Sequence, residues 1–326
     1  MNSKRAIIIS IVALLVGAIT VTVVKSNTVF SLLTQAVVYA IFASGIGVLL
    51  KQNGLVSFGH ALYFGAAGYA IGIILQQQIM SVEWAIFVTL LSVAGAAFAI
   101  GLIIVRVPGI AFGMLTLAIG QMFFLSVSRA RGVTGGTDGM QIDWPTTIFG
   151  FNQSAILKPA TMFLICWTTL VVVILLLTLL LNTRFGAITE AVRDNQERAS
   201  FIGISTIIPR AAIYALSATV TAVAGLLSTL NTGFISPESL HWSLSGMALM
   251  MVVVGGFKAL WGPALGAVVY FIFKDVLGDY ATHWMSIFGI ALITVIVFSP
   301  TGIAGALLAL LKSRASTFPR ATTNAH

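Results

Sequence analysis

The sequence predicts an all-α polytopic membrane protein with about ten transmembrane helices, eight or nine being the alternative. Of its 326 residues, 58 % are hydrophobic and only 8 % are charged, whereas soluble domains are roughly 45 to 50 % apolar. The mean hydropathy is +1.04. The apolar residues fall into runs, and about 20 residues make one helical crossing of a bilayer. Residues 1–312 are therefore expected to form a single transmembrane domain, with no room for a separate soluble one.

The ten expected spans alternate with short connections. They are Ala6–Val24, Val29–Leu50, Ala61–Ile79, Trp84–Val105, Leu115–Val127, Ala160–Leu181, Arg210–Leu230, Ser243–Gly255, Ala264–Leu277 and Trp284–Phe298. The first follows two basic residues without a cleavage pattern, and we interpret it as a retained anchor. With the N-terminus inside, 12 of the 17 Lys and Arg residues fall on the inner side. The positive-inside rule therefore places both termini in the cytoplasm, and residues 313–326 are expected to be a disordered cytoplasmic tail.

The connection after the second span is expected to be unwound or re-entrant. It reads KQNGLVSFGH from Lys51, and polar groups with glycines at membrane depth are tolerated only where they are buried in protein or line a cavity. The alternative for the histidine is a buried side chain that satisfies its own hydrogen bonds. The substrate-pathway candidates of this segment are Asn53, Ser57, Phe58 and His60.

A second helix break is expected after the fourth span. Pro108 removes a backbone donor, and Gly113 permits close approach of another helix. The chain should therefore stop and restart as a helix here, and Thr116 beyond the break is a further pathway candidate.

The longest outer connection, Arg129 to Pro159, contains the run VTGGTDG from Val133. Adjacent glycines followed by Thr and Asp can aim several backbone N–H groups in one direction or cap a half-helix, and either arrangement favours a carboxylate. The alternative is a flexible tight turn. The pathway candidates of this run are Thr134, Gly135, Gly136, Thr137 and Asp138.

One stretch between two spans, residues 184–209, is too polar for hydrocarbon. It holds five charged side chains within nine positions, and each charge costs roughly 2.5 to 3.5 kcal/mol at the centre of a transmembrane helix. We therefore expect a helical loop in water. As one helix it would pair Asp194 with Arg198 and Arg193 with Glu197, and it would lay an apolar stripe on the membrane domain, formed by Ile188, Ala191, Val192, Ala199 and Ile202. The opposite face would meet a partner, the alternative being a solvated hairpin without one.

The amino-acid sequence of this loop resembles that of a known family. Glu197, Arg198 and Ala199, followed after three residues by Gly203, are similar to the E-A-A-x-x-x-G loop of ABC-importer permeases, although Arg198 departs from that pattern. The preceding run EAVRDN from Glu190 is similar to the version in branched-chain amino acid permeases of the LivM type. Three further runs resemble the same family: NGLVSFGHALYFGAAGY from Asn53, RVPGIAFGMLTLA from Arg106 and TGGTDG from Thr134.

The resemblance implies that residues 184–209 form a cytoplasmic coupling helix that docks on an ATPase. The coupling candidates are then Glu190, Arg193, Asp194, Asn195, Glu197, Arg198, Ala199 and Gly203. It also implies a multi-pass subunit of the bacterial inner membrane, surrounded by lipid. Its partners would be a second homologous permease, two ATPase subunits and a periplasmic or extracellular substrate-binding protein. Selectivity would reside largely in the binding protein, so the solute stays open among branched-chain amino acids, other amino acids, urea and small aromatic acids.

The resemblance implies a transport subunit that performs no covalent chemistry. No phosphate loop, hydrolase elbow or metal-ligand spacing occurs, so no cofactor or metal is expected on this chain, and ATP and Mg²⁺ would be bound by the partner. The net charge of +8 is expected to orient the chain rather than to bind nucleic acid. The alternative function is an ion-coupled secondary transporter or a channel, which would place ionisable groups inside its spans. The nearest such groups are Lys274 and Asp275, close to the end of a span.

Overall fold

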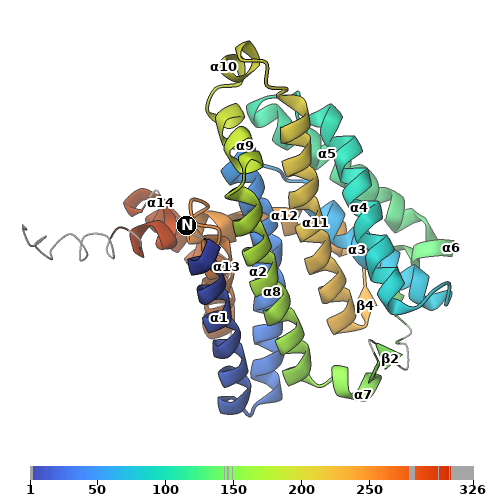
Figure 1. The fold of residues 1–326 in the computed structure, drawn as a ribbon. Coiled ribbons are helices and arrows are strands. Elements are labelled where there is room, and N and C mark those ends of the chain that lie inside the picture. Colours follow the sequence, from blue (N-terminus) through green and yellow to red (C-terminus); the bar gives the residue numbers. More distant parts are fainter. Residues whose placement is uncertain are drawn as a thin grey trace, which may run out of the picture.

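The protein is a helical bundle (Figure 1), described by a computed structural model for residues 3–142, 144, 147–148, 150–278, 283–299, 301–307 and 309. The expected tail, 313–326, lies outside the described residues. The first part of the chain forms α1 (Ser3–Val23), α2 (Asn27–Asn53), α3 (His60–Gln76), α4 (Val82–Ile104), α5 (Gly109–Arg129), α6 (Arg131–Thr134), η1 (Gly136–Asp138), β1 (Met140–Gln141), β2 (Thr147–Ile148), β3 (Phe151–Asn152) and α7 (Gln153–Ile156). The second part forms α8 (Pro159–Leu181), α9 (Arg184–Asp194), α10 (Gln196–Phe201), α11 (Ile207–Thr232), β4 (Phe234–Ile235), η2 (Pro237–Leu240), α12 (Trp242–Gly255), α13 (Gly262–Gly278) and α14 (Trp284–Phe298).

A helix occupies each of the ten apolar segments that the sequence predicts as spans. Within the described residues, six helices are long and apolar enough to cross a membrane, namely α1, α2, α4, α5, α8 and α11. The helices α3, α12 and α14 are apolar but shorter. The helical membrane architecture is therefore present, while ten crossings and cytoplasmic termini stay predictions. The expected break after the fourth span is also present, because α4 ends at Ile104 and α5 begins at Gly109, whose φ is +57°.

Two short antiparallel ladders are a departure from the all-α expectation. In one, β1 pairs with β4 in the register Met140 with Ile235. In the other, β2 pairs with β3 within the connection between α5 and α8. The first ladder ties the connection after α5 to the connection after α11, which the sequence pattern of apolar runs does not reveal.

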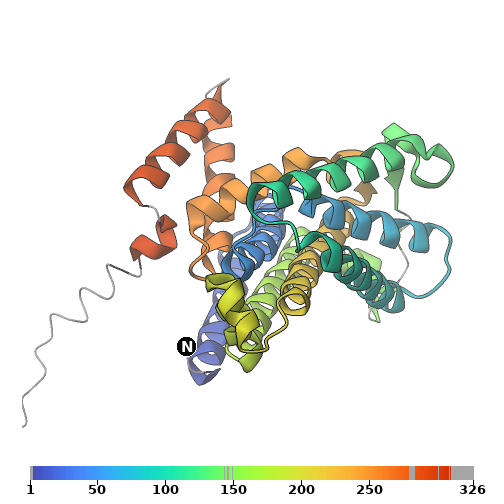
Figure 2. The same cartoon turned by 90° about the horizontal axis from the view of Figure 1, so that it is seen from above.

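The centre of the bundle is the pair α2 and α11. In the most apolar window of each helix, 78 % of α2 and 72 % of α11 are buried, against 11 % of α1. Small residues allow these helices to lie close together. A Cβ on Gly45 of α2 would lie 2.9 Å from the carbonyl oxygen of Ser217 on α11, and one on Gly225 of α11 would lie 2.0 Å from that of Phe64 on α3. Figure 2 shows α14 at the edge of the bundle, beyond α13.

The bundle has two ends with different contents. The α9/α10 end carries these two helices above the last turn of α2 and the first turn of α11 (Figure 1). Leu50, Glu190 and Phe257 line one cleft there, so the turn between α12 and α13 lies at the same end. The opposite end carries η1, η2 and the β1–β4 ladder.

Candidate functional site

The polar loop between α8 and α11 folds as two short helices instead of one. Asn195 has an extended backbone, with φ −156° and ψ 103°, that ends α9. Its side-chain oxygen accepts the backbone N–H of Arg198 at 2.8 Å and so caps α10, a role for which Asn is among the preferred residues. The prediction that one continuous helix pairs Asp194 with Arg198 and Arg193 with Glu197 is therefore wrong. Within the described residues, the ion pair of this loop joins the neighbours Arg193 and Asp194, with Nη2 and Oδ1 2.7 Å apart.

The expected apolar stripe of the loop is corrected as well. Val192 and Ala199 are buried, but Ile188 and Ala191 are exposed, because α9 buries the face formed by Gly186, Thr189 and Val192 instead. Ile202 does not lie on the membrane domain, since it is 72 % exposed.

Ile202 and its neighbour Phe201, which is 90 % exposed, form an apolar tip beyond α10. Two adjacent large apolar side chains on a polar loop are typical of a contact surface. Five coupling candidates of α9 and α10 are exposed polar side chains: Glu190, Asp194, Asn195, Glu197 and Arg198. Gly203, with φ +83°, ends the segment in a conformation that favours glycine.

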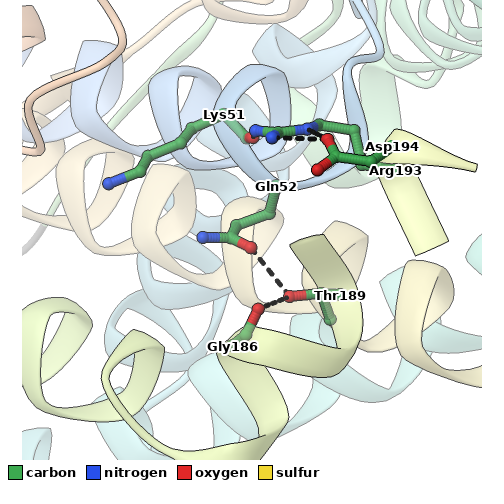
Figure 3. A network of polar contacts seen from close by, with 6 residues as sticks. All are labelled: Lys51, Gln52, Gly186, Thr189, Arg193 and Asp194. Carbon is green, nitrogen blue, oxygen red and sulfur yellow. Dashed lines mark hydrogen bonds and ion pairs between the residues drawn. The ribbon is translucent and has the colours of Figure 1, made fainter. Parts of the chain in front are cut away.

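Helix α9 is held to the end of α2 by a buried hydrogen bond (Figure 3). Thr189 Oγ1 lies 2.7 Å from Gln52 Oε1 and 2.9 Å from the carbonyl oxygen of Gly186. Thr189 is 0 % and Gln52 2 % exposed, so water does not compete for this contact. Gly186 permits the tight passage from α8 into α9, because a Cβ there would lie 2.0 Å from the carbonyl oxygen of Leu181.

Arg193 adds a second link between α9 and α2. Its Nη1 donates to the carbonyl oxygen of Lys51 at 2.5 Å, while Nε and Nη2 donate to Asp194 Oδ1 at 2.9 and 2.7 Å (Figure 3). The last carbonyls of a helix lack partners within the helix and attract cations. Arg193 therefore caps α2 with one side of its guanidinium and holds Asp194 with the other.

The other short helix, α10, is tied to α11. Arg210 Nη1 donates to Gln196 Oε1 at 3.1 Å, and Gln196 Nε2 donates to Thr206 Oγ1 at 3.4 Å. The carbonyl oxygen of Arg210 accepts from Asn53 Nδ2 at 2.9 Å, which joins the ends of α11 and α2. The two surface helices are thus bonded to the two central helices of the bundle, α9 to α2 and α10 to α11.

The segment after α2 leads to a buried polar chain around His60. Ser217 Oγ donates to the carbonyl oxygen of Gly45 at 2.6 Å and lies 2.7 Å from His60 Nε2. Because the Ser217 hydroxyl has a single proton, it accepts from Nε2–H, and His60 Nδ1 then accepts from Ser57 Oγ at 2.8 Å. All three side chains are 0 % exposed. His60 is therefore a buried histidine whose two ring nitrogens both have hydrogen-bond partners, which is the alternative named from the sequence. A role in lining the solute pathway stays a prediction.

The unwound segment also contacts α5. Phe58 N donates to Thr116 Oγ1 at 3.2 Å, and Thr116 Oγ1 donates to the carbonyl oxygen of Gly113 at 2.8 Å. Thr116 is buried, whereas Phe58 lines a cavity of about 430 Å³ between this segment and the start of α5. Asn53, Ser57, Phe58, His60 and Thr116 are therefore brought together, but of these Phe58 is the one that lines this cavity.

The glycine run at the far end of α5 forms a compact turn, away from the other pathway candidates. Thr134 Oγ1 donates to the carbonyl oxygens of Val127 and Ala130 and accepts the N–H of Gly136. Gly135 and Gly136 have φ of +74° and +65°. Thr137 and Asp138 are exposed beside them. The geometry is that of the tight turn named as the alternative, and binding of a carboxylate here stays a prediction.

Three positions that organise this site carry only weak signals in the sequence. Gln52 is a single amide at the end of an apolar run, Ser217 is one of many hydroxyls in the spans, and Phe201 resembles any apolar residue near a membrane. The partners of Gln52 and Ser217 lie 137 and 157 positions away in the sequence. Within the described residues no group of three or more His, Cys, Asp or Glu side chains could hold a metal ion.

Long apolar helices that carry two polar helices at one end are the architecture of a multi-pass membrane protein. The comparison with protein families agrees, since the model of the branched-chain amino acid transport system permease component matches residues 28–299. The chain belongs to this family.

Its relatives include two kinds of permease. The high-affinity branched-chain amino acid transport system permease protein LivM of Escherichia coli (strain K12) is 22 % identical over 313 residues, which cover 90 % of this chain and 74 % of the relative. The autoinducer 2 import system permease protein LsrC of Salmonella choleraesuis (strain SC-B67) is 26 % identical over 311 residues, covering 91 % and 85 %. No solved structure matches the chain.

Proposed function

We propose that this chain is the transmembrane permease subunit of an ABC importer of the bacterial inner membrane. Its solute would be a branched-chain amino acid or a related small carboxylate. The family and the names of the relatives, which include both amino-acid transport and import, support this proposal. The observation that carries it is the pair α9 and α10, which exposes charge and an apolar tip to a partner while each helix is hydrogen-bonded to a different buried helix.

In the proposed mechanism, α9 and α10 face the cytoplasm and sit on an ATPase subunit. Closure of the ATPase pair on ATP displaces them, and the displacement reaches α2 through Thr189 and Arg193 and α11 through Gln196. Since α2 and α11 are the centre of the bundle, their movement can open the solute path to one side and then to the other. The permease performs no covalent step, and ATP with Mg²⁺ is bound by the partner.

The remaining partners follow from the same proposal. A second homologous permease completes the path, two ATPase subunits supply the motion, and a soluble binding protein delivers the solute at the end opposite α9 and α10. The exposed η1, the β1–β4 ladder and η2 gather at that end and offer a surface for delivery. Selectivity among solutes is assigned largely to the binding protein.

The experiment is uptake of radiolabelled leucine into proteoliposomes that contain the chain, a candidate second permease, a candidate ATPase pair and its binding protein. Glu197→Lys reverses an exposed charge on α10, and Arg193→Glu removes the cap on α2 as well. Both should lower ATP-dependent uptake at least tenfold without lowering the amount of inserted protein. Lys25→Glu, an exposed charge reversal at the opposite end of α2, is the matched control and should transport normally.

Two results would overturn the proposal. Undiminished uptake by both loop variants would remove the coupling role of α9 and α10. Leucine uptake by the chain alone, driven by an ion gradient in liposomes that lack the ATPase, would favour the ion-coupled transporter instead.

A further inference from the structure

A small cavity lies between α2, α11, α12 and α13, at the end of the bundle opposite α9 and α10. Its volume is about 160 Å³. Asn231 is the penultimate residue of α11, and Lys274 lies four residues before the end of α13. Gln35, in the third turn of α2, completes its polar side. Gln35 lies about 12 Å along α2 from the first residue of that helix, at the helical rise of ~1.5 Å per residue. The cavity is thus close to this end of the bundle.

Three of its side chains lack protein partners in the described part of the chain. The amides of Gln35 and Asn231 and the ammonium of Lys274 make no hydrogen bond or ion pair with any described residue. Lys274 Nζ lies 5.6 Å from the ring centre of Phe271, so its contact within the protein is with an aromatic face. Polar groups near hydrocarbon are costly unless something satisfies them. Gln35 and Lys274 are exposed and Asn231 is half-buried, so water reaches these donors, and a ligand seated in the cavity can replace that water.

The chemistry of the lining favours an anion. Ammonium, amide and hydroxyl groups all supply hydrogen-bond donors, and Ser228 adds a hydroxyl to the same wall. The neighbouring acid, Asp275, is exposed as Lys274 is, but it is not among the residues that line the cavity. Phe271 and Met247 provide an apolar side against which a hydrocarbon group can pack.

The size of the cavity limits what it holds. A volume of about 160 Å³ equals roughly five water molecules at ~30 Å³ each, and drug-sized sites begin near ~300 Å³. The cavity therefore fits one small head group, with any hydrocarbon part left outside it.

We propose that this cavity is a binding site for an anionic oxygen group, with Lys274 as the charge partner and Gln35 and Asn231 as hydrogen-bond donors. The group is either the carboxylate of a small solute or the phosphate of an anionic lipid. This site goes beyond the proposed function, because it needs neither an ATPase nor a second permease. It can exist whether or not the chain works as an importer.

The test uses the purified full chain in lipid nanodiscs, with one arm for each source of the anion. In the lipid arm, native mass spectrometry counts phosphatidylglycerol molecules that stay bound after transfer from nanodiscs containing that lipid. In the solute arm, nanodiscs of phosphatidylcholine alone are titrated with L-leucine, with inorganic phosphate and with L-leucinamide, which has no carboxylate. Calorimetry gives the affinities, and size-exclusion chromatography checks that each variant is folded.

Lys274→Gln removes the charge and keeps a polar hydrogen-bond donor on a side chain one atom shorter. Loss of a charge-assisted hydrogen bond weakens binding by about tenfold to hundredfold, and this loss is expected in whichever arm shows binding. Lys274→Arg should restore most of it. Lys258→Gln is the matched control, since it removes an exposed lysine at the α9/α10 end and should bind as the unaltered chain does. Absence of binding in both arms, or equal binding by Lys274→Gln and the unaltered chain, would overturn the proposal.

Discussion

Replacing Thr189 by valine tests whether α9 is held to α2 by the buried hydrogen bond between Thr189 and Gln52. Valine keeps the shape of threonine but removes the hydroxyl, so the Oε1 of Gln52, in a side chain only 2 % exposed, loses its donor. Leaving a buried acceptor unpaired costs about 1–3 kcal/mol. If α9 can detach locally, the equilibrium between its detached and attached forms should rise by about 5- to 150-fold.

The assay is hydrogen exchange of the α9 backbone amides, read by mass spectrometry of the purified chain in nanodiscs. Exchange in α9 should become faster by that factor in Thr189→Val. The double variant Thr189→Val with Gln52→Leu should recover most of the protection, because replacing both partners by apolar groups is nearly neutral.

Thr178→Val is the matched control for this prediction. The hydroxyl of Thr178 bonds the carbonyl oxygen of Ile174 within its own helix, so no side chain is left unpaired by its removal. Exchange in α9 should then be unchanged. Unaltered exchange in Thr189→Val, or a double variant that exchanges as fast as the single one, would refute the reasoning.

Three further predictions concern the tip, the core and the helix contacts. Phe201→Asp should abolish co-purification with the ATPase without lowering thermal stability, since its side chain is 90 % exposed; Ile110→Asp, 85 % exposed on α5, should leave co-purification intact. Ser217→Ala should destabilise the fold by about 1–3 kcal/mol, seen as a lower melting temperature, because the Nε2–H of a fully buried histidine loses its acceptor. Gly225→Ala should sharply reduce the yield of folded protein, because its Cβ would lie 2.0 Å from a carbonyl oxygen of α3, whereas Gly95→Ala, with no atom within 4 Å, should keep or raise stability. Equal yields for the two glycine variants would contradict this packing.

The sequence predicts the helices well because long apolar runs leave a chain in a bilayer few alternatives to a helix. Backbone polar groups must be satisfied within the segment there, so all ten segments are found as helices near their predicted bounds. The polar loop is also visible, since its charges cannot enter hydrocarbon. The break of this loop into two helices could not be predicted, because the charge spacing fits one continuous helix. The competing preference of Asn195 for the start of a helix is a local effect of about 1 kcal/mol.

Contacts between distant segments could not be predicted from one sequence. Gln52 and Thr189 are 137 positions apart, and His60 and Ser217 are 157 positions apart. Nothing in the residue types singles out these pairs among the many hydroxyls of the spans. The β1–β4 ladder is two residues long on each side, too short to leave a strand pattern. The resemblance identified the family, and the structure adds which side chains join the loop to the bundle.

The central claim is that α9 and α10 face the cytoplasm and are covered there by an ATPase. The most direct measurement uses Ser200→Cys, an exposed position on α10, since the natural Cys166 is buried. A membrane-impermeant maleimide should label Ser200→Cys in inside-out vesicles and not in right-side-out ones, and the ATPase should protect it. Thr137→Cys, exposed at the opposite end, should show the reverse sidedness and no protection. Labelling of Ser200→Cys from the outside, or full labelling with the ATPase bound, would contradict the account.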